Sequence, residues 1–210
     1  MIKNIFLISI CLFTVSISYA FEGIITQVYT DVNTKEQKTF VWYISNDVVR
    51  FDIVSGEETV TILPDFKNLT LSYFGNKAGA DGVNYYSTSS ISEVKVNAPK
   101  LRVLEQTDSK YNDKDAKEVK LMSSEGLLVV QYLNTIPMNM KNMLTYFAES
   151  KEFQAISLVG DSGFPVSSVI MTNNEAIYTL TTKSIVEKSL SESIFKIPSN
   201  YKLFDPSTIK

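Results

Sequence analysis

The sequence predicts a mainly β (α+β) domain built on an antiparallel sheet, and three observations predict it. Tyr, Phe, Val, Ile and Thr, which favour strands, are abundant along the chain. Short runs of these residues are separated by polar turn residues at close spacing, which is typical of an antiparallel meander. Helical spacing of apolar residues is clear in one segment only, so we expect few helices.

The first five strands are expected soon after residue 20. They are placed at Gly23–Thr30, Thr39–Ile44, Val48–Ile53, Thr59–Leu63 and Leu69–Tyr73. Turn-forming residues such as Asn46-Asp47 separate them, so neighbouring strands should pair antiparallel. On the second strand Phe40, Trp42 and Ile44 occupy alternate positions, which places them on one face of the sheet.

The remaining strands are less regular. Residues 83–96 are rich in Ser and are expected to be extended with irregular ends. Further strands are expected at Leu101–Glu105, Lys117–Met122, Leu127–Leu133, Pro165–Thr172 and Ala176–Lys183. The polar stretch Asp108–Asp115 is expected to form a loop, and a short turn is expected at Ser191–Ile194.

One helix is expected after Pro137, with Asn139 as its N-cap. Its apolar residues follow the i, i+3, i+4, i+7 spacing of a helical stripe: Met140, Met143, Leu144 and Phe147. We expect the helix to fade near Phe153. The stripe has two interpretations. It is ordinary core that covers the sheet, or, because flexible thioethers pack against ligands of variable shape, it is part of a ligand-binding surface.

Residues 1–20 have the pattern of a secretory signal peptide. Lys3 supplies the positive charge, residues 5–15 are apolar, and Ser18-Tyr19-Ala20 is a small-x-small cleavage motif. We expect cleavage between Ala20 and Phe21. The remaining chain, residues 21–210, is then a single domain that is periplasmic or secreted.

Two alternatives to a cleaved signal peptide fit the segment less well. One is an uncleaved membrane anchor, for which the apolar stretch is short. The other is lipid attachment at Cys11, but Ile10 occupies the position at which a lipobox needs a small residue.

Without residues 1–20 the chain contains no histidine and no cysteine, because the sequence has no His and its one Cys is Cys11. The usual proton shuttle, thiol nucleophile and best zinc ligands are therefore absent. We expect no metal site, no cofactor and no enzymatic activity. Removal of Lys3 also leaves 19 Lys and Arg against 23 Asp and Glu. Nucleic acid is not an expected partner, because phosphate binding needs a basic face.

The S-x-x-K spacing of serine acyl-transfer enzymes occurs twice, at Ser92–Lys95 and Ser193–Lys196. That chemistry places the Lys one helical turn beyond the nucleophile, and neither copy lies in a segment with clear helical periodicity. A hydrolase that uses carboxylates or a Ser-Lys pair is therefore a third interpretation, behind two non-enzymatic ones.

The C-terminal third carries motifs that resemble an uncharacterised family of bacterial exported proteins. Gly163-Phe164-Pro165-Val166 is followed by a hairpin and then by the segment Leu190–Lys202, which contains the Phe-x-Ile-Pro-x-x-Tyr tail Phe195–Tyr201. The first strands also fit, with Trp42-Tyr43-Ile44 and Val49-Arg50-Phe51. This family resembles the outer-membrane lipoprotein carrier superfamily, which includes the LolA-like and LppX-like proteins.

The resemblance implies that residues 21–210 form a curved antiparallel sheet, an unclosed half-barrel, with one or two helices capping its concave face. It also implies a periplasmic, non-enzymatic protein of the lipoprotein-carrier type that binds a lipid or a lipoprotein acyl chain between sheet and helices. Together with strand alternation and helix spacing, it places the ligand against Phe40, Trp42, Ile44, Met140, Met143, Leu144 and Phe147.

The alternative function uses the same fold with a filled core. The protein is then a cell-envelope structural or protein-interaction module that binds a partner at its sheet edge or rim, because an unclosed sheet leaves edges that must be covered or used. The expected partner is thus a lipid or acyl chain, or an envelope protein. The chain is expected to be a monomer.

Overall fold

The computed structural model describes residues 21–45, 48–79, 81–90, 101–148 and 150–204, and it confirms the mainly β fold. The strands are β1 (Glu22–Asp31), β2 (Gln37–Ser45), β3 (Val48–Ser55), β4 (Glu58–Asp65), β5 (Thr70–Gly75), β6 (Asn84–Ser90), β7 (Arg102–Tyr111), β8 (Lys114–Ser123), β9 (Gly126–Leu133), β10 (Phe164–Thr172), β11 (Glu175–Glu187) and β12 (Tyr201–Leu203). The helices are α1 (Met140–Tyr146), α2 (Lys151–Leu158) and the short 3-10 helix η2 (Glu192–Phe195).

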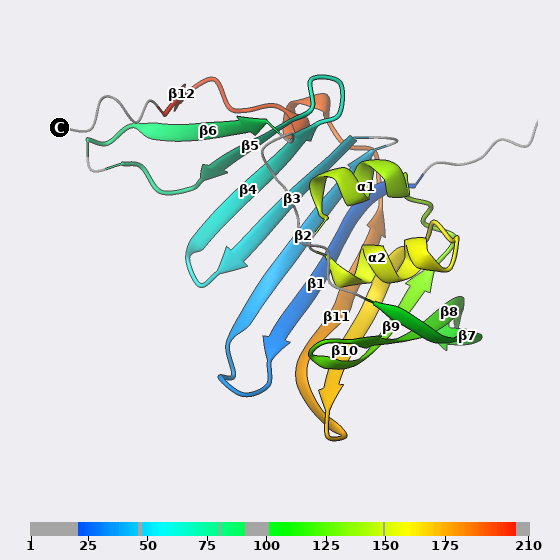
Figure 1. The fold of residues 1–210 in the computed structure, drawn as a ribbon. Helices are drawn as coiled ribbons and strands as arrows, with labels where there is room; N and C mark the ends of the chain where they lie inside the picture. The colour runs from blue at the N-terminus through cyan, green and yellow to red at the C-terminus, as the bar shows by residue number, and fades with distance from the viewer. Residues whose placement is uncertain (1–20, 46–47, 80, 91–100, 149, 205–210) are drawn as a thin grey trace, which may run out of the picture.

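The strands form one twelve-stranded sheet in the order β12-β6-β5-β4-β3-β2-β1-β11-β10-β9-β8-β7. The two ends of this order, β12 and β7, do not pair with each other, so the sheet is open. Apart from the parallel pair β12–β6, the strand pairs of the described residues are antiparallel. Figure 1 shows α1 and α2 in front of one face of the sheet. We call this the helix-side face, and the opposite one the outer face.

The register of the first strands follows from the alternation of apolar residues. Ile25 on β1 pairs with Trp42 on β2, Trp42 with Phe51 on β3, and Phe51 with Ile62 on β4. These four side chains form a row across the helix-side face. A shift of one residue would turn the side chains of the shifted strand to the outer face, so burial of the row fixes the register.

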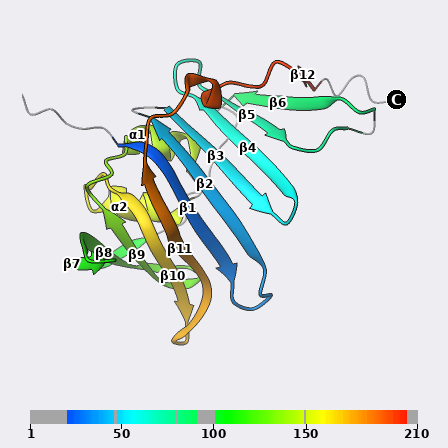
Figure 2. The ribbon, with the colours of Figure 1, turned by 180° about the vertical axis from the view of Figure 1, so that it is seen from behind.

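The sheet curls strongly at its β7 end. The Tyr111 hydroxyl on β7 donates a hydrogen bond to the backbone oxygen of Thr182 on β11, at 2.9 Å. These two strands are four positions apart in the sheet order, which in a flat sheet is about 19 Å. The strands between them must therefore bend round, and in Figure 2 β7 and β8 run across the direction of β1–β4.

The prediction of a loop at residues 108–115 is wrong. β7 continues to Tyr111 and β8 begins at Lys114, so these residues form a tight hairpin. Asn112 and Asp113 make its two-residue turn, with φ of 49° and 64°. Asn and Asp tolerate positive φ, so polar residues that suggested a loop belong to an exposed end strand and its turn.

The predicted helix begins as expected but ends earlier. Asn139 caps α1, and its side-chain oxygen accepts a backbone hydrogen bond from the first turn at 3.1 Å. α1 ends at Tyr146, and Phe147 leaves the helical conformation with φ −120° and ψ 43°. The expectation that one helix continues to near Phe153 is therefore wrong. Ser150 caps a second helix, α2, through its hydroxyl.

Two apolar clusters form the core. The buried members of the first cluster are Phe21, Ile25, Trp42, Ile44, Val49, Phe51, Ala116, Leu133, Ile136, Met138, Met143, Phe153, Phe164 and Val166. The second cluster joins α2 to β8, β9 and β10, and its buried members are Val119, Leu121, Leu128, Val130, Tyr132, Ala155, Ile156 and Ile170. Residues of both clusters come from the sheet and from the helices, so burial holds the helices on this face.

Candidate functional site

The seven side chains predicted to line a cavity lie together at the first cluster. They divide into two groups: Trp42, Ile44 and Met143 are buried members of the cluster, and Phe40, Met140, Leu144 and Phe147 pack against it half-buried. Strand alternation on β2 and helical spacing on α1 therefore identified residues that meet between the sheet and the helix.

Trp42 lies at the centre of this group. Its ring centroid is 4.1 Å from that of Phe51 and 5.1 Å from that of Phe147. Phe153 and Phe164 contact it edge-on, at 5.7 and 5.6 Å. Aromatic rings in these arrangements pack closely. The space around the indole is therefore filled by side chains.

Gln27 fixes the position of Trp42, and the sequence analysis missed it. Gln27 is 1% exposed, and its side-chain oxygen accepts a hydrogen bond from the indole N–H of Trp42 at 2.9 Å. Its amide nitrogen donates to the Pro165 backbone oxygen at 2.8 Å and to the Thr182 hydroxyl at 3.2 Å. Burial of this amide is tolerated because both of its polar atoms are paired. The available signal was its place in the alternation of β1, on the same face as Ile25.

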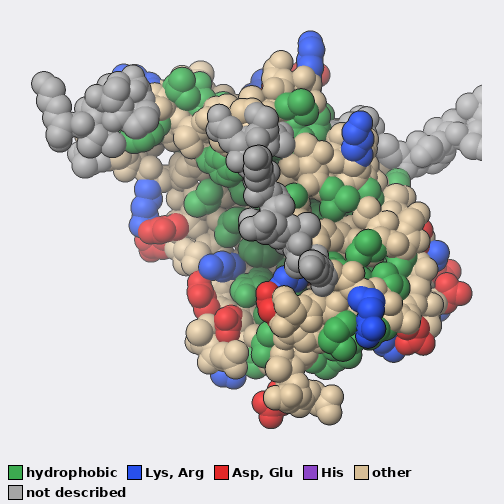
Figure 3. All heavy atoms as spheres, viewed as in Figure 1, with side chains coloured by type: hydrophobic (Ala, Val, Ile, Leu, Met, Phe, Trp, Pro, Cys, Tyr) green, Lys and Arg blue, Asp and Glu red, His purple; other side chains and the backbone are tan. Residues whose placement is uncertain are grey.

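The helix-side face is covered unevenly. Phe40, Ile53 and Ile62 on β2, β3 and β4 are only half-buried against the first cluster, and Val60 on β4 is 43% exposed. The register pairs Phe40 with Ile53 and Ile53 with Val60. We call these four residues the open apolar surface. Figure 3 shows hydrophobic side chains gathered in the middle of this face.

α1 is attached to the turn between β4 and β5. The Tyr146 hydroxyl donates a hydrogen bond to the Asp65 backbone oxygen at 2.6 Å, and its ring meets that of Phe66 edge-on at 4.6 Å. α1 has only seven residues. A helix of this length is marginal by itself, so its position depends on these side-chain contacts.

α2 is held to the sheet by a carboxylate. One oxygen of Glu152 accepts hydrogen bonds from the hydroxyls of Ser168, at 2.8 Å, and Tyr178, at 3.1 Å. Its other oxygen accepts from Ser150 at 3.0 Å. Burial raises the pKa of Tyr178, and the Glu152 charge raises this pKa further, so the phenol stays protonated and remains a donor. The hydrogen bonds from Ser168 on β10 and Tyr178 on β11 therefore attach α2 to the sheet.

A second polar network lies around Asp161. One oxygen of this carboxylate accepts hydrogen bonds from Tyr132 at 2.7 Å, Gln106 at 2.9 Å and Lys117 at 3.1 Å. Burial alone raises the pKa of Asp161, but the hydrogen bonds from Tyr132 and Lys117 outweigh burial and hold this pKa below its usual value. The network supports Tyr132 at the end of the second cluster.

The Ser-Lys hypothesis gains no support from the copy that can be placed. Ser92–Lys95 lies outside the described residues. In the other copy, the Ser193 hydroxyl lies 2.9 Å from that of Ser191, and the Lys196 ammonium pairs with Glu192 at 3.5 Å. Across the described ranges no three His, Cys, Asp or Glu residues are grouped so as to hold a metal ion. The helices seen in those ranges include none with the length and hydropathy needed to cross a membrane.

Comparison with known proteins does not identify a family. No protein-family model matches the chain, and no curated protein matches it. A similar solved structure, described as "Structure of PNGF-II in C2 space group", shares 16% sequence identity at a TM-score of 0.49. The match covers 90% of this chain and 32% of that chain, so this chain spans about one third of that protein. A likeness at this level establishes no relationship in function.

Proposed function

We propose that the protein is a non-enzymatic binding protein for an acyl chain of a lipid or lipoprotein, of the lipoprotein-carrier type, and that it acts in the periplasm. The observation that supports this proposal is the open apolar surface of Phe40, Ile53, Val60 and Ile62 beside the first cluster. An acyl chain needs no polar partner, and each CH₂ that it buries contributes about 0.8 kcal/mol.

The half-buried residues of α1 extend this surface into a site with two walls. Met140, Leu144 and Phe147 pack against the same cluster as Phe40 and Ile62. We propose that the helices cap the concave face of a half-barrel and that α1 shifts to admit the chain. α1 suits this role because it is short and carries a flexible methionine. α2, fixed through its carboxylate, stays in place.

Binding is tested with a fluorescent acyl probe titrated into the purified protein, together with native mass spectrometry after mild extraction. The variants Phe40→Gln and Ile62→Gln place an amide on the open apolar surface. We expect each to weaken probe binding at least about tenfold, which corresponds to about 1.4 kcal/mol. Native spectra of the wild-type protein should show a bound lipid mass.

Val186→Gln is the matched control, because Val186 is 47% exposed on β11 and pairs with Ile24, whose side chain faces away from the first cluster. It should bind the probe like the wild type. Circular dichroism checks that all three variants are folded. Protein that is lipid-free in every preparation and does not bind the probe, or variants that bind it as tightly as the control, would rule out this function.

A second candidate function is a cell-envelope interaction module with a filled core. The observation that favours it is the close packing around Trp42, which is 6% exposed and surrounded by Phe51, Phe147, Phe153 and Phe164. Pull-down from envelope extracts separates the two functions. A stoichiometric protein partner without bound lipid supports the interaction module, and bound lipid without such a partner supports acyl binding.

A further inference from the structure

A separate hollow lies on the outer face of the sheet, beneath the segment of residues 188–204. We call it the outer groove. It consists of two cavities of about 520 and 410 Å³ that share Val48, Phe195 and Lys196. The first is further lined by Leu63, Pro64, Asp65, Phe66, Lys67, Ser72 and Ile197. Volumes in this range are typical of sites for small molecules.

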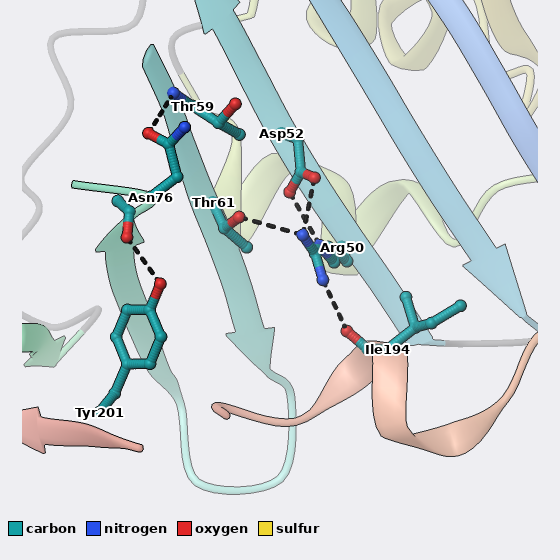
Figure 4. A network of polar contacts seen from close by, with 8 residues as sticks. Arg50, Asp52, Thr59, Thr61, Asn76, Ile194 and Tyr201 are labelled. Atoms are coloured by element: carbon teal, nitrogen blue, oxygen red, sulfur yellow. Dashed lines mark hydrogen bonds and ion pairs between the residues drawn. The ribbon is translucent and has the colours of Figure 1, made fainter. Parts of the chain in front are cut away.

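Polar contacts hold the 188–204 segment to the sheet. The Glu22 carboxylate accepts a hydrogen bond from the backbone N–H of Leu190 at 2.7 Å. Arg50 donates to the backbone oxygen of Ile194 at 3.3 Å, and the Tyr201 hydroxyl donates to the backbone oxygen of Gly75 at 2.8 Å (Figure 4). Because these contacts hold the segment against the sheet at three points, the segment forms a fixed wall of the groove.

Arg50 is itself held firmly. Its guanidinium forms two 2.8 Å hydrogen bonds with Asp52, which is 5% exposed, and a third at 3.3 Å with Thr61. Its carbon lies 5.1 Å from the ring centre of Tyr43 and 6.0 Å from that of Phe74. A bidentate, stacked guanidinium has little freedom. The position of the 188–204 segment is thereby tied to β3 and β4.

The interior of the outer groove is mainly apolar. Leu63 forms part of its floor, and Phe195 and Ile197 come from the 188–204 segment above it. Val48, shared by both cavities, is 43% exposed. An apolar hollow with an exposed valine gains free energy when a hydrocarbon chain displaces water from it.

Two acids, Asp65 and Glu192, and two lysines, Lys67 and Lys196, line the outer groove. The Asp65 carboxylate accepts hydrogen bonds from the backbone N–H groups of Lys67 and Asn68, both at 3.0 Å, and from the Asn68 amide at 2.7 Å. Lys196 pairs only at 3.5 Å with Glu192, and both side chains are well exposed, so the pair is weak. Among the described residues no ion pair is formed by Lys67. Two ammonium groups are therefore available to an anion.

We propose that the outer groove binds an anionic amphiphile. Its single aliphatic chain lies on Val48, Leu63 and Phe195, and its carboxylate or phosphate is held by Lys67 and Lys196. The site is on the opposite face from the open apolar surface, so it does not depend on acyl-chain binding there. The outer groove recognises the charged head group of its ligand, whereas the helix-side face offers apolar contacts.

The probes are dodecanoate and dodecyl phosphate, each below its critical micelle concentration, with dodecanol as the neutral analogue. Binding to the isotope-labelled protein is followed by amide chemical shifts. We expect both anions to shift Val48, Leu63 and Ile197. The double variant Lys67→Gln/Lys196→Gln should bind them at least tenfold more weakly and should bind dodecanol as the wild type does.

The matched control is Lys35→Gln/Lys183→Gln, which removes two exposed lysines that do not line the outer groove. It should bind both anions normally. Ile62→Gln, which disturbs only the helix-side face, should leave the shifts at Val48 unchanged even if acyl binding on that face fails. The proposal is overturned if the anions shift only helix-side residues, if they do not bind, or if the two double variants bind them equally.

Discussion

The two halves of the sheet bury their apolar residues in different ways. In the closed half, β7–β11 with α2, the sheet curls until the Tyr111 hydroxyl contacts the Thr182 backbone oxygen. Each buried residue of the second cluster there is 0% exposed. In the open half, β2–β6, the helix-side face keeps half-buried residues such as Phe40 and Ile62, while the 188–204 segment covers the outer face. Similar strand alternation thus yields a sealed core or an accessible surface, depending on what covers it.

The two halves also differ in how their helices are held. α2 is anchored by the Glu152 carboxylate and contributes the fully buried Ala155 and Ile156 to the second cluster. α1 is attached to the β4–β5 turn of the open half by the Tyr146–Asp65 hydrogen bond, and Phe147 at its end contacts the rings of Trp42 and Phe51. Segments with fewer buried contacts open more readily than a close-packed core. The proposed acyl-chain site would therefore open at α1.

The largest expected effect is that of Trp42→Ala, at the boundary between the halves. It should lower the free energy of unfolding by about 3–5 kcal/mol, because a large buried ring is lost and the Gln27 oxygen loses its donor. Trp42 is the single tryptophan, so the variant has no tryptophan fluorescence, and urea unfolding is followed by circular dichroism instead. Trp42→Phe, which keeps a ring, should lose less. A loss below about 1 kcal/mol would show that the cluster is not close-packed.

Arg50→Ala tests how the open half holds its outer cover. It leaves the buried Asp52 carboxylate without its partner, and we expect a loss of about 3 kcal/mol. Trypsin cleavage after Lys188, Lys196 and Lys202 should become faster, because the Ile194 oxygen loses its donor.

The control for this change is the double variant Arg50→Met/Asp52→Leu, which removes both charges. It should recover most of the stability and still be cleaved faster than the wild type in the 188–204 segment. Unchanged cleavage in both variants would mean that Arg50 does not hold the segment.

One pair of matched substitutions compares the halves directly. Ile170 on β10 is 0% exposed in the second cluster, and Ile62 on β4 is half-buried in the open apolar surface. Ile170→Ala should cost about 3 kcal/mol and Ile62→Ala about 1, because truncation of a fully buried side chain leaves a cavity. Both are measured by urea unfolding under the same conditions. Equal losses would contradict the distinction between the halves.

The smallest effect concerns acid stability in the closed half. The pKa of Asp161 is lowered in the folded state, because hydrogen bonds from Tyr132 and Lys117 outweigh burial. Its contribution is present above the unfolded pKa, near 4, and is lost as the pH falls through the lower folded value. Asp161→Asn should therefore show a flatter decline in stability below pH 4 than the wild type. Parallel pH profiles for the two proteins would refute the assignment.

The sequence predicted those features that depend on local pattern. Alternation placed Phe40, Trp42 and Ile44 on one face, and the i, i+3, i+4 spacing placed Met140 and Met143 on the side of α1 that meets them. The mainly β class and the antiparallel pairing of the first strands followed from the same period of two. The Asn139 cap was also predicted, because capping depends on a single side chain and its own turn.

Features set by distant contacts were not predicted. Phe147 was assigned to a continuous helix because its spacing fits, but α1 ends before it and its ring packs against Trp42. No local sequence pattern indicates that the Gln27 amide will form hydrogen bonds with residues of two other strands. Residues 108–111 look like a loop because they are mostly polar and show no apolar alternation, although Ser109 and Tyr111 are half-buried. Coverage of the outer face by the 188–204 segment likewise depends on long-range contacts.

The pairing of β1 with β11 has a consequence for how the protein acquires its structure. The Gln27–Thr182 contact in this pair joins residues 155 positions apart, and the strands lie side by side in the middle of the sheet. Closing so long a loop must precede any stabilisation from the contact, so folding is expected to be slow and to await the last third of the chain. During synthesis from the N-terminus the sheet therefore cannot be completed before the residues of β11 have been made.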